Sequence, residues 1–312
     1  MIRHRPGRFP ARTDGLFYLN FRATDRDRWI LAMLREHQVL TAQHFAALAF
    51  GSLRTANRRL AELAELGLVD RTRSNPTGPG PSSYLYTLGP QGALLLGAER
   101  GLSVKELRYD RARAQRQALR PDIAHTLGCN TLMTRLAAHD AGTGPRLNVW
   151  LGPLSCLRRW GNQIRPDAYG HQAEPSTDPG LGCGFFLEYD TGTESVRQLA
   201  AKVHGYNRFA QNHTGHRPVL IHTSAPAREA RLHEVLTETF GICPVPIATT
   251  TDPQVAGPVW LPHDATARTT ISILPETFVA RGYRILTPLE HDPEYPAPVW
   301  NRQGQQGGRY GP

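Results

Sequence analysis

Lysine is almost missing from this sequence. Only two of its 36 basic residues are lysines, Lys105 and Lys202, and the other 34 are arginines. Lys202 lies in the segment GFFLEYDTGTESVRQLAAKVHGY, residues 184–206, which places several acidic groups just after an apolar run. Lysine is a compact, mobile charge and arginine a flat, rigid one, so the two are not interchangeable at a chemical site. A lysine at this position therefore favours a function over a merely solvated helix charge, which is the alternative.

Long apolar runs are missing as well. No stretch of 18 apolar residues occurs, and the first residues, MIRHRPGRFPARTDG, lack the apolar core of a signal peptide. Neither membrane insertion nor export is supported by these features. We therefore expect a cytoplasmic protein.

Several common site motifs are absent. The four cysteines are isolated, without a CxxC pair, which disfavours a zinc ribbon or a redox dithiol and fits reduced thiols. A zinc site built from Cys156, His171 and Cys183 is the less favoured alternative, because structural zinc sites usually have closely spaced ligand pairs. The chain has no GxxxxGK[ST] loop, which disfavours ATP-driven work. It also has no His-x-His pair, which disfavours a relaxase of the histidine-hydrophobe-histidine type.

Positive charge is concentrated in the first part of the chain. The net charge of the 312 residues is +9, yet residues 1–120 hold 20 Arg and Lys against 10 Asp and Glu, whereas residues 121–312 hold 16 against 17. A chain of this length is more natural for two domains than for one. A basic excess confined to one part is expected of a domain that contacts the phosphate backbone of nucleic acid, and a basic solvated surface is the alternative.

The first part predicts three helices and a hairpin. Thr24, Thr41 and Ser52 each precede a run of apolar residues at helical spacing and are suitable N-caps, and Gly67 ends the third helix. Two alternating runs, LVDRTRS and SYLYTL, flank the Pro- and Gly-rich loop NPTGPGPS and predict a hairpin. This order resembles a winged helix-turn-helix over about residues 24–98.

The resemblance implies binding to double-stranded DNA. The third helix directs Arg54, Asn57 and Arg58 to solvent, and Arg71 and Arg73 lie at the predicted wing, so these five residues are the candidate DNA contacts. Such a domain can instead serve dimerisation or protein docking, and winged helices often act as homodimers. The arginine-rich residues 99–120 predict a basic linker helix.

The second part predicts the order αβββαβ followed by a further helix. The expected elements are a helix at 122–140, strands near 147–151 and around Ile164, a strand at 184–190, a helix at 194–210, a strand at 218–224 and a helix at 227–239. On the second strand we expect Asp167, and on the third Glu188 and Asp190 on one face, because side chains alternate along a strand. Adjacent acidic groups repel each other unless a cation lies between them, and Mg²⁺ (or Mn²⁺) is a suitable occupant for carboxylate oxygens. Asp167 and Glu188 are therefore the candidate metal ligands.

Here the sequence resembles the PD-(D/E)XK nuclease superfamily. Asp167, preceded by Pro166, matches the first acidic position of the motif, and Glu188 matches the second. At the lysine position this chain has Asp190 instead. Some members supply the lysine from the following helix, where Lys202 lies, with Glu194 and Gln198 on the same polar stripe. The resemblance implies an α/β (α+β) fold with a nuclease-like core. It also implies that the catalytic residues are Asp167, Glu188, Asp190 and Lys202.

The whole layout is similar to the replication-relaxation family of plasmids and integrative elements, over about residues 24–245. This resemblance implies a plasmid-borne DNA-processing or replication-associated role. The acidic residues and Lys202 of the nuclease-like core predict a Mg²⁺-dependent DNA endonuclease or nickase, and the alternative is a non-catalytic DNA-binding accessory or regulator with a degenerate nuclease fold. A protein-docking scaffold is disfavoured by the one-sided charge. The predicted divisions are a basic arm at 1–23, the winged helix at 24–98, the linker at 99–120, the nuclease-like domain at 121–250, and a Pro-rich extension at 251–312 with one strand at 269–274 and a disordered tail.

Overall fold

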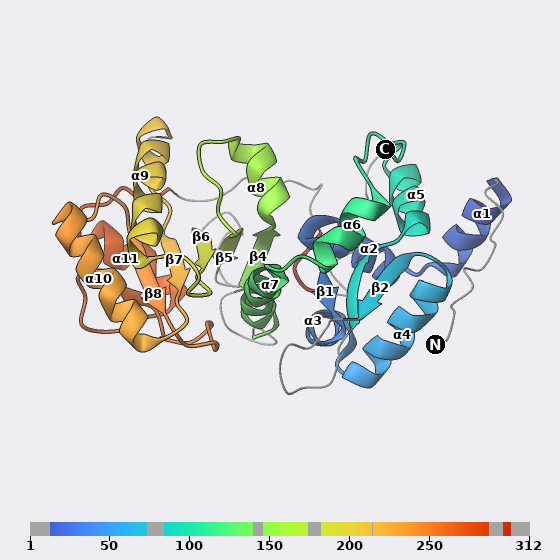
Figure 1. The fold of residues 1–312 in the computed structure, drawn as a ribbon, viewed down its shortest axis with the longest axis horizontal. Helices are drawn as coiled ribbons and strands as arrows, with labels where there is room; N and C mark the ends of the chain where they lie inside the picture. The colour runs from blue at the N-terminus through green and yellow to red at the C-terminus, as the bar shows by residue number, and fades with distance from the viewer. Residues whose placement is uncertain are drawn as a thin grey trace. The chain divides into compact units, whose positions relative to one another are not determined.

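A computed structural model describes residues 13–73, 84–139, 146–173, 182–213, 215–286 and 296–300. The chain divides into two compact units, one of residues 1–123 together with 300–312, and one of residues 124–299. Both contain helices and a sheet (Figure 1), so the predicted mixed class of helices and strands is confirmed. No helix within these described ranges combines the length and apolar character required to cross a bilayer.

The first unit contains a bundle of helices and a small sheet. Its elements are α1 (Thr13–Arg22), α2 (Asp25–His37), β1 (Leu40–Thr41), α3 (Ala42–Phe45) with a π-helical turn η1 (Ala46–Phe50), α4 (Leu53–Glu65), β2 (Val69–Arg73), β3 (Tyr84–Leu88), α5 (Pro90–Glu99) and α6 (Arg111–Ala118). The three strands are antiparallel in the order β1-β3-β2.

Local capping explains why the predicted helices begin where they do. Thr24, Thr41 and Ser52 are the N-caps of α2, α3 and α4, and the side chain of each accepts a hydrogen bond from a backbone N–H one turn into the helix. The cap of α2 is reciprocal, because Asp27 accepts from the Thr24 backbone at 2.7 Å. Asp27 is fully buried and also accepts from the Arg59 guanidinium of α4, at 2.9 and 2.5 Å, which ties the two helices together.

Three features of this unit differ from the sequence-based expectation. The expected N-terminal arm contains helix α1, the short strand β1 joins the predicted hairpin, and the expected linker helix at 99–120 is helical only at α6. The loop between the two strands of the hairpin, residues 74–83, lies outside the described residues.

The second unit is built on one larger sheet. Its elements are α7 (Ile123–Ala138), which begins at the boundary between the units, β4 (Arg146–Leu151), α8 (Pro153–Trp160), β5 (Ala168–Ala173), β6 (Cys183–Tyr189), α9 (Val196–Asn212), β7 (Val219–His222), α10 (Pro226–Phe240), β8 (Ile247–Thr250), β9 (Leu261–Pro262), η2 (Ile271–Ile273) and α11 (Leu274–Val279).

The sheet changes from antiparallel to parallel in its middle. Its order is β4-β5-β6-β7-β8-β9, in which β4, β5 and β6 form an antiparallel meander, β7 and β8 run parallel to β6, and β9 is antiparallel to β8. The parallel pair β6 and β7 is joined by α9, as a crossover between parallel strands requires.

Different helices cover the two faces of this sheet. Phe186 of β6 packs in a core with side chains from α8, α9 and α10, including Trp160, Val203 and Leu232. Leu187 and Tyr189 point to the other face, where the Tyr189 ring lies so close to α7 that a Cβ at Gly128 would meet it at 2.3 Å. Glu188, two residues after Phe186, therefore points to the face covered by α9.

Three expectations for this unit need correction. The second strand starts at Ala168 rather than around Ile164, because α8 and the turn after it occupy residues 153–167. Residues 269–274 do not form the predicted strand but a short helical turn that leads into α11, whose Pro275 lies in the first turn. The expected extension contributes buried side chains such as Trp260 and Phe278 to this unit, and the expected disordered tail at 301–312 lies outside the described residues.

Candidate functional site

Asp167 and Glu188 meet at one end of the sheet. Ala168 of β5 pairs with Leu187 of β6 in antiparallel register, so the next pair along the two strands is Asp167 and Glu188. The Asp167 backbone N–H donates to the Leu187 carbonyl at 3.0 Å, which continues the ladder by one residue. In addition to burial, the charge of Asp167 raises the pKa of Glu188, so the two carboxylates are neighbours at this end of the sheet.

Glu188 is held by two side chains of α9. Lys202 Nζ donates to Glu188 Oε2 at 2.9 Å, and the Tyr206 hydroxyl donates to Oε1 at 2.5 Å. Lys202 and Tyr206 are four residues apart and therefore share one side of the helix. Only 2% of Glu188 is exposed, so both oxygens of an almost fully buried carboxylate have a hydrogen-bond donor.

The sequence around α9 explains how Lys202 reaches this position. Ser195 caps the helix, and Gln198 completes the capping box by accepting from the Ser195 backbone at 2.9 Å. Leu199 and Val203 are buried against the sheet and fix the rotation of the helix. Gln198 is therefore a capping residue. Glu194 lies close to the lysine, with its Oε2 3.5 Å from Lys202 Nζ.

Asp167 is the more accessible carboxylate of the pair. Its Oδ2 accepts the Tyr189 backbone N–H at 2.8 Å and lies 3.0 Å from His125 Nε2 of α7. The exposed fractions of the two side chains are 19% for Asp167 and 34% for His125, compared with 3% for Glu188. The site thus opens to solvent at Asp167, His125 and Lys202, and Glu188 forms its floor.

The charges at the site act on one another. Burial, reinforced by the charge of Asp167, raises the pKa of Glu188 to about 7 against the opposing effect of Lys202. Burial would lower the pKa of Lys202, but the Glu188 carboxylate outweighs it and the pKa is raised, so the ammonium stays charged. The hydrogen bond to Asp167 raises the pKa of His125. The Lys202 ammonium can stabilise negative charge on a phosphate. The two carboxylates can bind a hard cation.

Asp190 is not part of this cluster. Its carboxylate forms an ion pair with Arg228 of α10, with a second bond from Arg228 at 2.9 Å, and it accepts the Gly192 backbone N–H at 2.9 Å. The structure thus brings together Asp167, Glu188 and Lys202 from the predicted set and gives Asp190 a different partner. Asp190 fastens the end of β6 to α10.

Two residues at the site, and the residue that pairs with Asp190 outside it, were not among the predicted functional ones. His125 lies on the first helix of the second unit, and Tyr206 follows Lys202 at helical spacing, so both could have been selected from the sequence. Arg228 is 38 residues from Asp190, and no local pattern connects them.

The predicted DNA-contact residues lie on two elements of the first unit. Arg54, Asn57 and Arg58 are exposed on α4, whose opposite side is buried at Ala56, Leu60 and Leu63. Arg71 and Arg73 lie on β2, with their guanidinium groups 5.1 and 5.7 Å from the centre of the Tyr84 ring. The exposed side of α4 thus presents two arginines and an amide to solvent.

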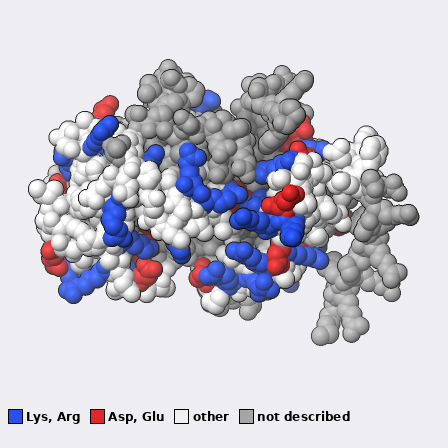
Figure 2. Space-filling view, turned by 90° about the horizontal axis from the view of Figure 1, so that it is seen from above, with Lys and Arg blue, Asp and Glu red and all other residues white. Residues whose placement is uncertain are grey.

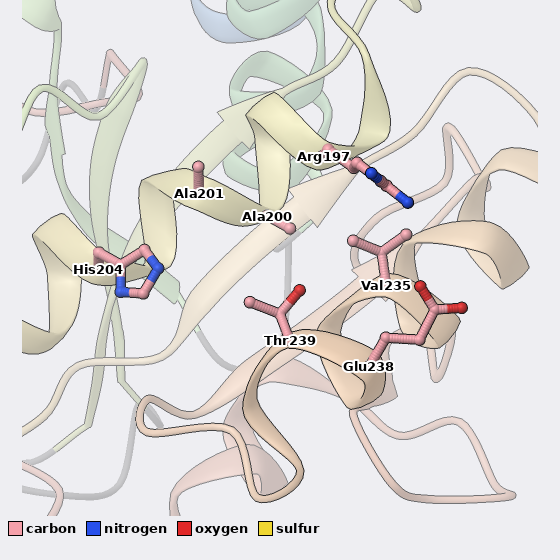
Figure 3. Close-up of a pocket in the computed structure, with 7 residues that line it drawn as sticks. All are labelled: Arg197, Ala200, Ala201, His204, Val235, Glu238 and Thr239. Carbon is pink, nitrogen blue, oxygen red and sulfur yellow. The ribbon is translucent and has the colours of Figure 1, made fainter.

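A separate pocket of about 320 Å³ lies between α9 and α10. It is lined by Arg197, Ala200, Ala201 and His204 of α9 and by Val235, Glu238 and Thr239 of α10 (Figure 3). Glu238 already pairs with Arg231 at 3.0 Å. The pocket contains none of the predicted site residues and no pair of carboxylates, so the chemistry points to the sheet end rather than to this pocket.

The donor set at the sheet end is too small for a closed metal cage. Within the described parts of the chain, no group of three or more His, Cys, Asp or Glu side chains gathers as a metal-binding cluster. Mg²⁺ usually keeps several waters and is bound by one or two carboxylates together with substrate phosphate. The neighbouring carboxylates of Asp167 and Glu188 are donors of this type, although Lys202 and Tyr206 each occupy one oxygen of Glu188.

A comparison with models of protein families identifies a match. The family model described as replication-relaxation matches residues 31–220, which is more than half of the chain and includes α4, Asp167, Glu188 and Lys202. No curated protein matches the chain.

Proposed function

The chain belongs to the replication-relaxation family, which indicates a role in the replication or relaxation of mobile elements, and we propose that it fulfils this role as a Mg²⁺-dependent DNA endonuclease or nickase. The observation that carries the proposal is the cluster of Asp167, Glu188 and Lys202. These residues come from the turn before β5, from β6 and from α9, and the 2.9 Å contact between Lys202 and Glu188 lies beside the partly exposed Asp167.

Cleavage of a phosphodiester bond depends chiefly on positioning and on stabilising the charge that develops at phosphorus. Lys202 supplies a fixed positive charge, since Glu188 holds its ammonium and 39% of its side chain remains exposed. Asp167 and Glu188 are the residues that would hold Mg²⁺ or Mn²⁺, which when bound polarises the phosphate and the attacking water. His125 donates from Nε2 to Asp167, which orients this carboxylate beside Lys202.

The order of elements supports a nuclease-like core. The succession α7, β4, β5, β6, α9 and β7 is αβββαβ, with α8 added between the first two strands, and the sheet order follows the chain order. The PD-(D/E)XK superfamily, which the sequence resembles, has this core. In this proposal Lys202 of α9 takes the place of the strand lysine, because position 190 is an aspartate bound to Arg228.

The first unit is the proposed double-stranded DNA-binding domain. The order α2, β1, α3, α4, β2 and β3 is that of a winged helix-turn-helix, in which α4 would be the recognition helix. Arg54, Asn57 and Arg58 on its exposed side are suited to base edges and phosphates. Arg71 and Arg73 would contact the backbone from the wing.

A specific observation favours a second candidate function. Glu188 is satisfied by Lys202 and Tyr206 without any metal, and Asp190 is satisfied by Arg228. A closed set of contacts of this kind is also compatible with a nuclease fold that only binds DNA, as an accessory or regulator of replication.

The test is incubation of supercoiled plasmid with the protein in Mg²⁺, Mn²⁺ or EDTA. We expect conversion to the nicked or linear form that requires the metal and is lost in Asp167→Asn, while Glu234→Gln, an exposed carboxylate of α10, behaves as the wild type. The plasmids should include one that carries the DNA around the chain's own coding sequence. DNA binding without metal-dependent cleavage of any plasmid would replace the nuclease with the non-catalytic function.

A further inference from the structure

Helix α8 and the turn that follows it carry three exposed arginines, Arg158, Arg159 and Arg165. The turn leads directly to Asp167, since Arg165 is separated from it only by Pro166. This segment, residues 153–166, is an addition to the αβββαβ order, so the nuclease-like core does not explain its presence or its charge.

The segment is anchored on the face of the sheet that bears Lys202. Helix α8 buries Cys156 and Trp160, and the Trp160 ring packs against Tyr169, Phe186 and Phe209 with centroid distances of 5.2, 5.1 and 6.2 Å. The turn then passes α9, where a Cβ at Gly205 would lie 3.9 Å from the Gln163 carbonyl oxygen. Burial of one side of α8 leaves its arginines on the outer side, in a fixed position relative to α9.

The charge of this segment is entirely positive. Residues 141–166 contain no Asp or Glu, although the chain from residue 121 onward holds more acidic than basic residues. Figure 2 looks onto the side of the molecule where α8 and α9 lie in Figure 1, and Lys and Arg side chains gather over α8 there. A local positive surface of this kind attracts a polyanion.

The contacts of Arg159 and Arg165 differ from those of the structural arginines in the same unit. Arg228, Arg231 and Arg268 all pair with carboxylates. Arg165 instead donates to the amide oxygen of Asn162 at 2.6 Å, and no carboxylate of the described residues forms an ion pair with Arg159 or Arg165. An arginine that is oriented by a neutral oxygen keeps its positive charge available for a phosphate.

We propose that Arg158, Arg159 and Arg165 bind the phosphodiester backbone of the DNA beside the reacting phosphate. This inference rests on the proposed function for the identity of the ligand. The segment would hold the backbone across α8 while Lys202 and Asp167 act on one phosphate. These contacts to the DNA backbone would supplement those made by the first unit, and they would not depend on the base sequence.

The test measures DNA binding by the full chain in EDTA, where no cleavage occurs. A variant with Arg158→Gln, Arg159→Gln and Arg165→Gln should bind a duplex more weakly than the wild type. The slope of log affinity against log salt concentration should decrease in size by about 2 to 3, because each lost phosphate contact removes about 0.9. The matched control replaces Arg146, Arg197 and Arg231 with glutamine, which removes the same charge from other exposed positions of the second unit.

A variant with lysine at the three positions keeps their positive charge and therefore distinguishes a loss of charge from a loss of folding. It should restore most of the salt slope, since lysine also binds phosphate as a point charge. Equal slopes for the glutamine variant and the wild type, or equal losses in the variant and its control, would overturn the inference. The result does not depend on catalysis. If the wild type never cleaves DNA but the glutamine variant binds it more weakly, the phosphate contacts of the three arginines are supported and the nuclease function is rejected. If the wild type cleaves DNA but the glutamine variant binds it equally well, the nuclease function is supported and the phosphate contacts are rejected.

Discussion

Glu188 is an almost fully buried carboxylate whose two oxygens accept hydrogen bonds from Lys202 and Tyr206. A buried charge is costly unless it is paired and hydrogen-bonded, so the fold maintains Glu188 only together with these partners. Asp167 beside it is accessible and raises the pKa of Glu188 further. The site therefore carries an electrostatic repulsion that a divalent cation would relieve, and this is the physical basis of the proposed metal site.

Replacement of Asp167 tests the metal site directly. We expect calorimetric titration with Mn²⁺ to show binding to the wild type and none to Asp167→Asn, since the amide lacks the charge that a hard cation requires. Glu234→Gln on α10 should bind as the wild type does. Equal Mn²⁺ binding by the wild type and Asp167→Asn would exclude Asp167 as a ligand.

At the scale of the helix or strand, the sequence predicts best where the signal is local. The starts of α2, α3 and α4 could be predicted because Thr24, Thr41 and Ser52 cap their own helices. Glu188 and Lys202 could be expected near each other because a strand and the helix that follows it pack together. Helix α8 and the pairing of Asp190 with Arg228 could not be predicted, since α8 is short and the ion pair joins residues far apart in the sequence.

The junction of α2 and α4 has a pH dependence that follows from Asp27. Burial would raise the pKa of Asp27, but hydrogen bonds from Arg59 and Thr24 outweigh it, and the pKa is held below 3.8. A depressed pKa means that the ion pair contributes stability above the ordinary pKa and that this contribution is lost as the pH falls through the lowered value.

We therefore expect Asp27→Asn to destabilise the protein by about 1.5 to 3 kcal/mol at neutral pH, because it removes the charged acceptor of Arg59 while Arg59 keeps its contact with Glu62. The deficit should shrink in acid as the wild type loses the same contribution. Urea unfolding at several pH values measures both effects. Asp122→Asn, in which the replaced carboxylate is exposed, serves as the control, and a deficit that stays constant down to the most acidic pH would contradict the account.

Helix α4 is the element on which sequence-specific DNA binding should depend. Arg58→Ala should weaken binding to the cognate site by about 1 to 3 kcal/mol if Arg58 contacts a base. Arg231→Ala, an exposed arginine of α10 that pairs with glutamates, should leave the affinity unchanged. Fluorescence anisotropy with a labelled duplex compares the two, and equal affinities for Arg58→Ala and the wild type would remove Arg58 from the interface.

In the proposed function, the two units of the molecule have different tasks. The positive excess lies in the part of the chain that forms the first unit, and the clustered carboxylates with Lys202 lie in the second. The family match extends from residue 31 to residue 220 and so includes elements of both units. In the proposed function the first unit selects the DNA and the second cleaves it.

The most direct test of this account compares the two lysines of the chain. Nicking of supercoiled plasmid in Mg²⁺ should be on the order of 100-fold slower or more in Lys202→Met, because loss of one positioned donor to a reacting group has an effect of that size. Lys105→Met, which changes an exposed lysine of the first unit, should cleave at the wild-type rate, and Lys202→Arg should recover only part of the activity. DNA affinity should be the same in all three variants. Equal cleavage rates in Lys202→Met and Lys105→Met would contradict the central claim that Lys202 acts at the reacting phosphate.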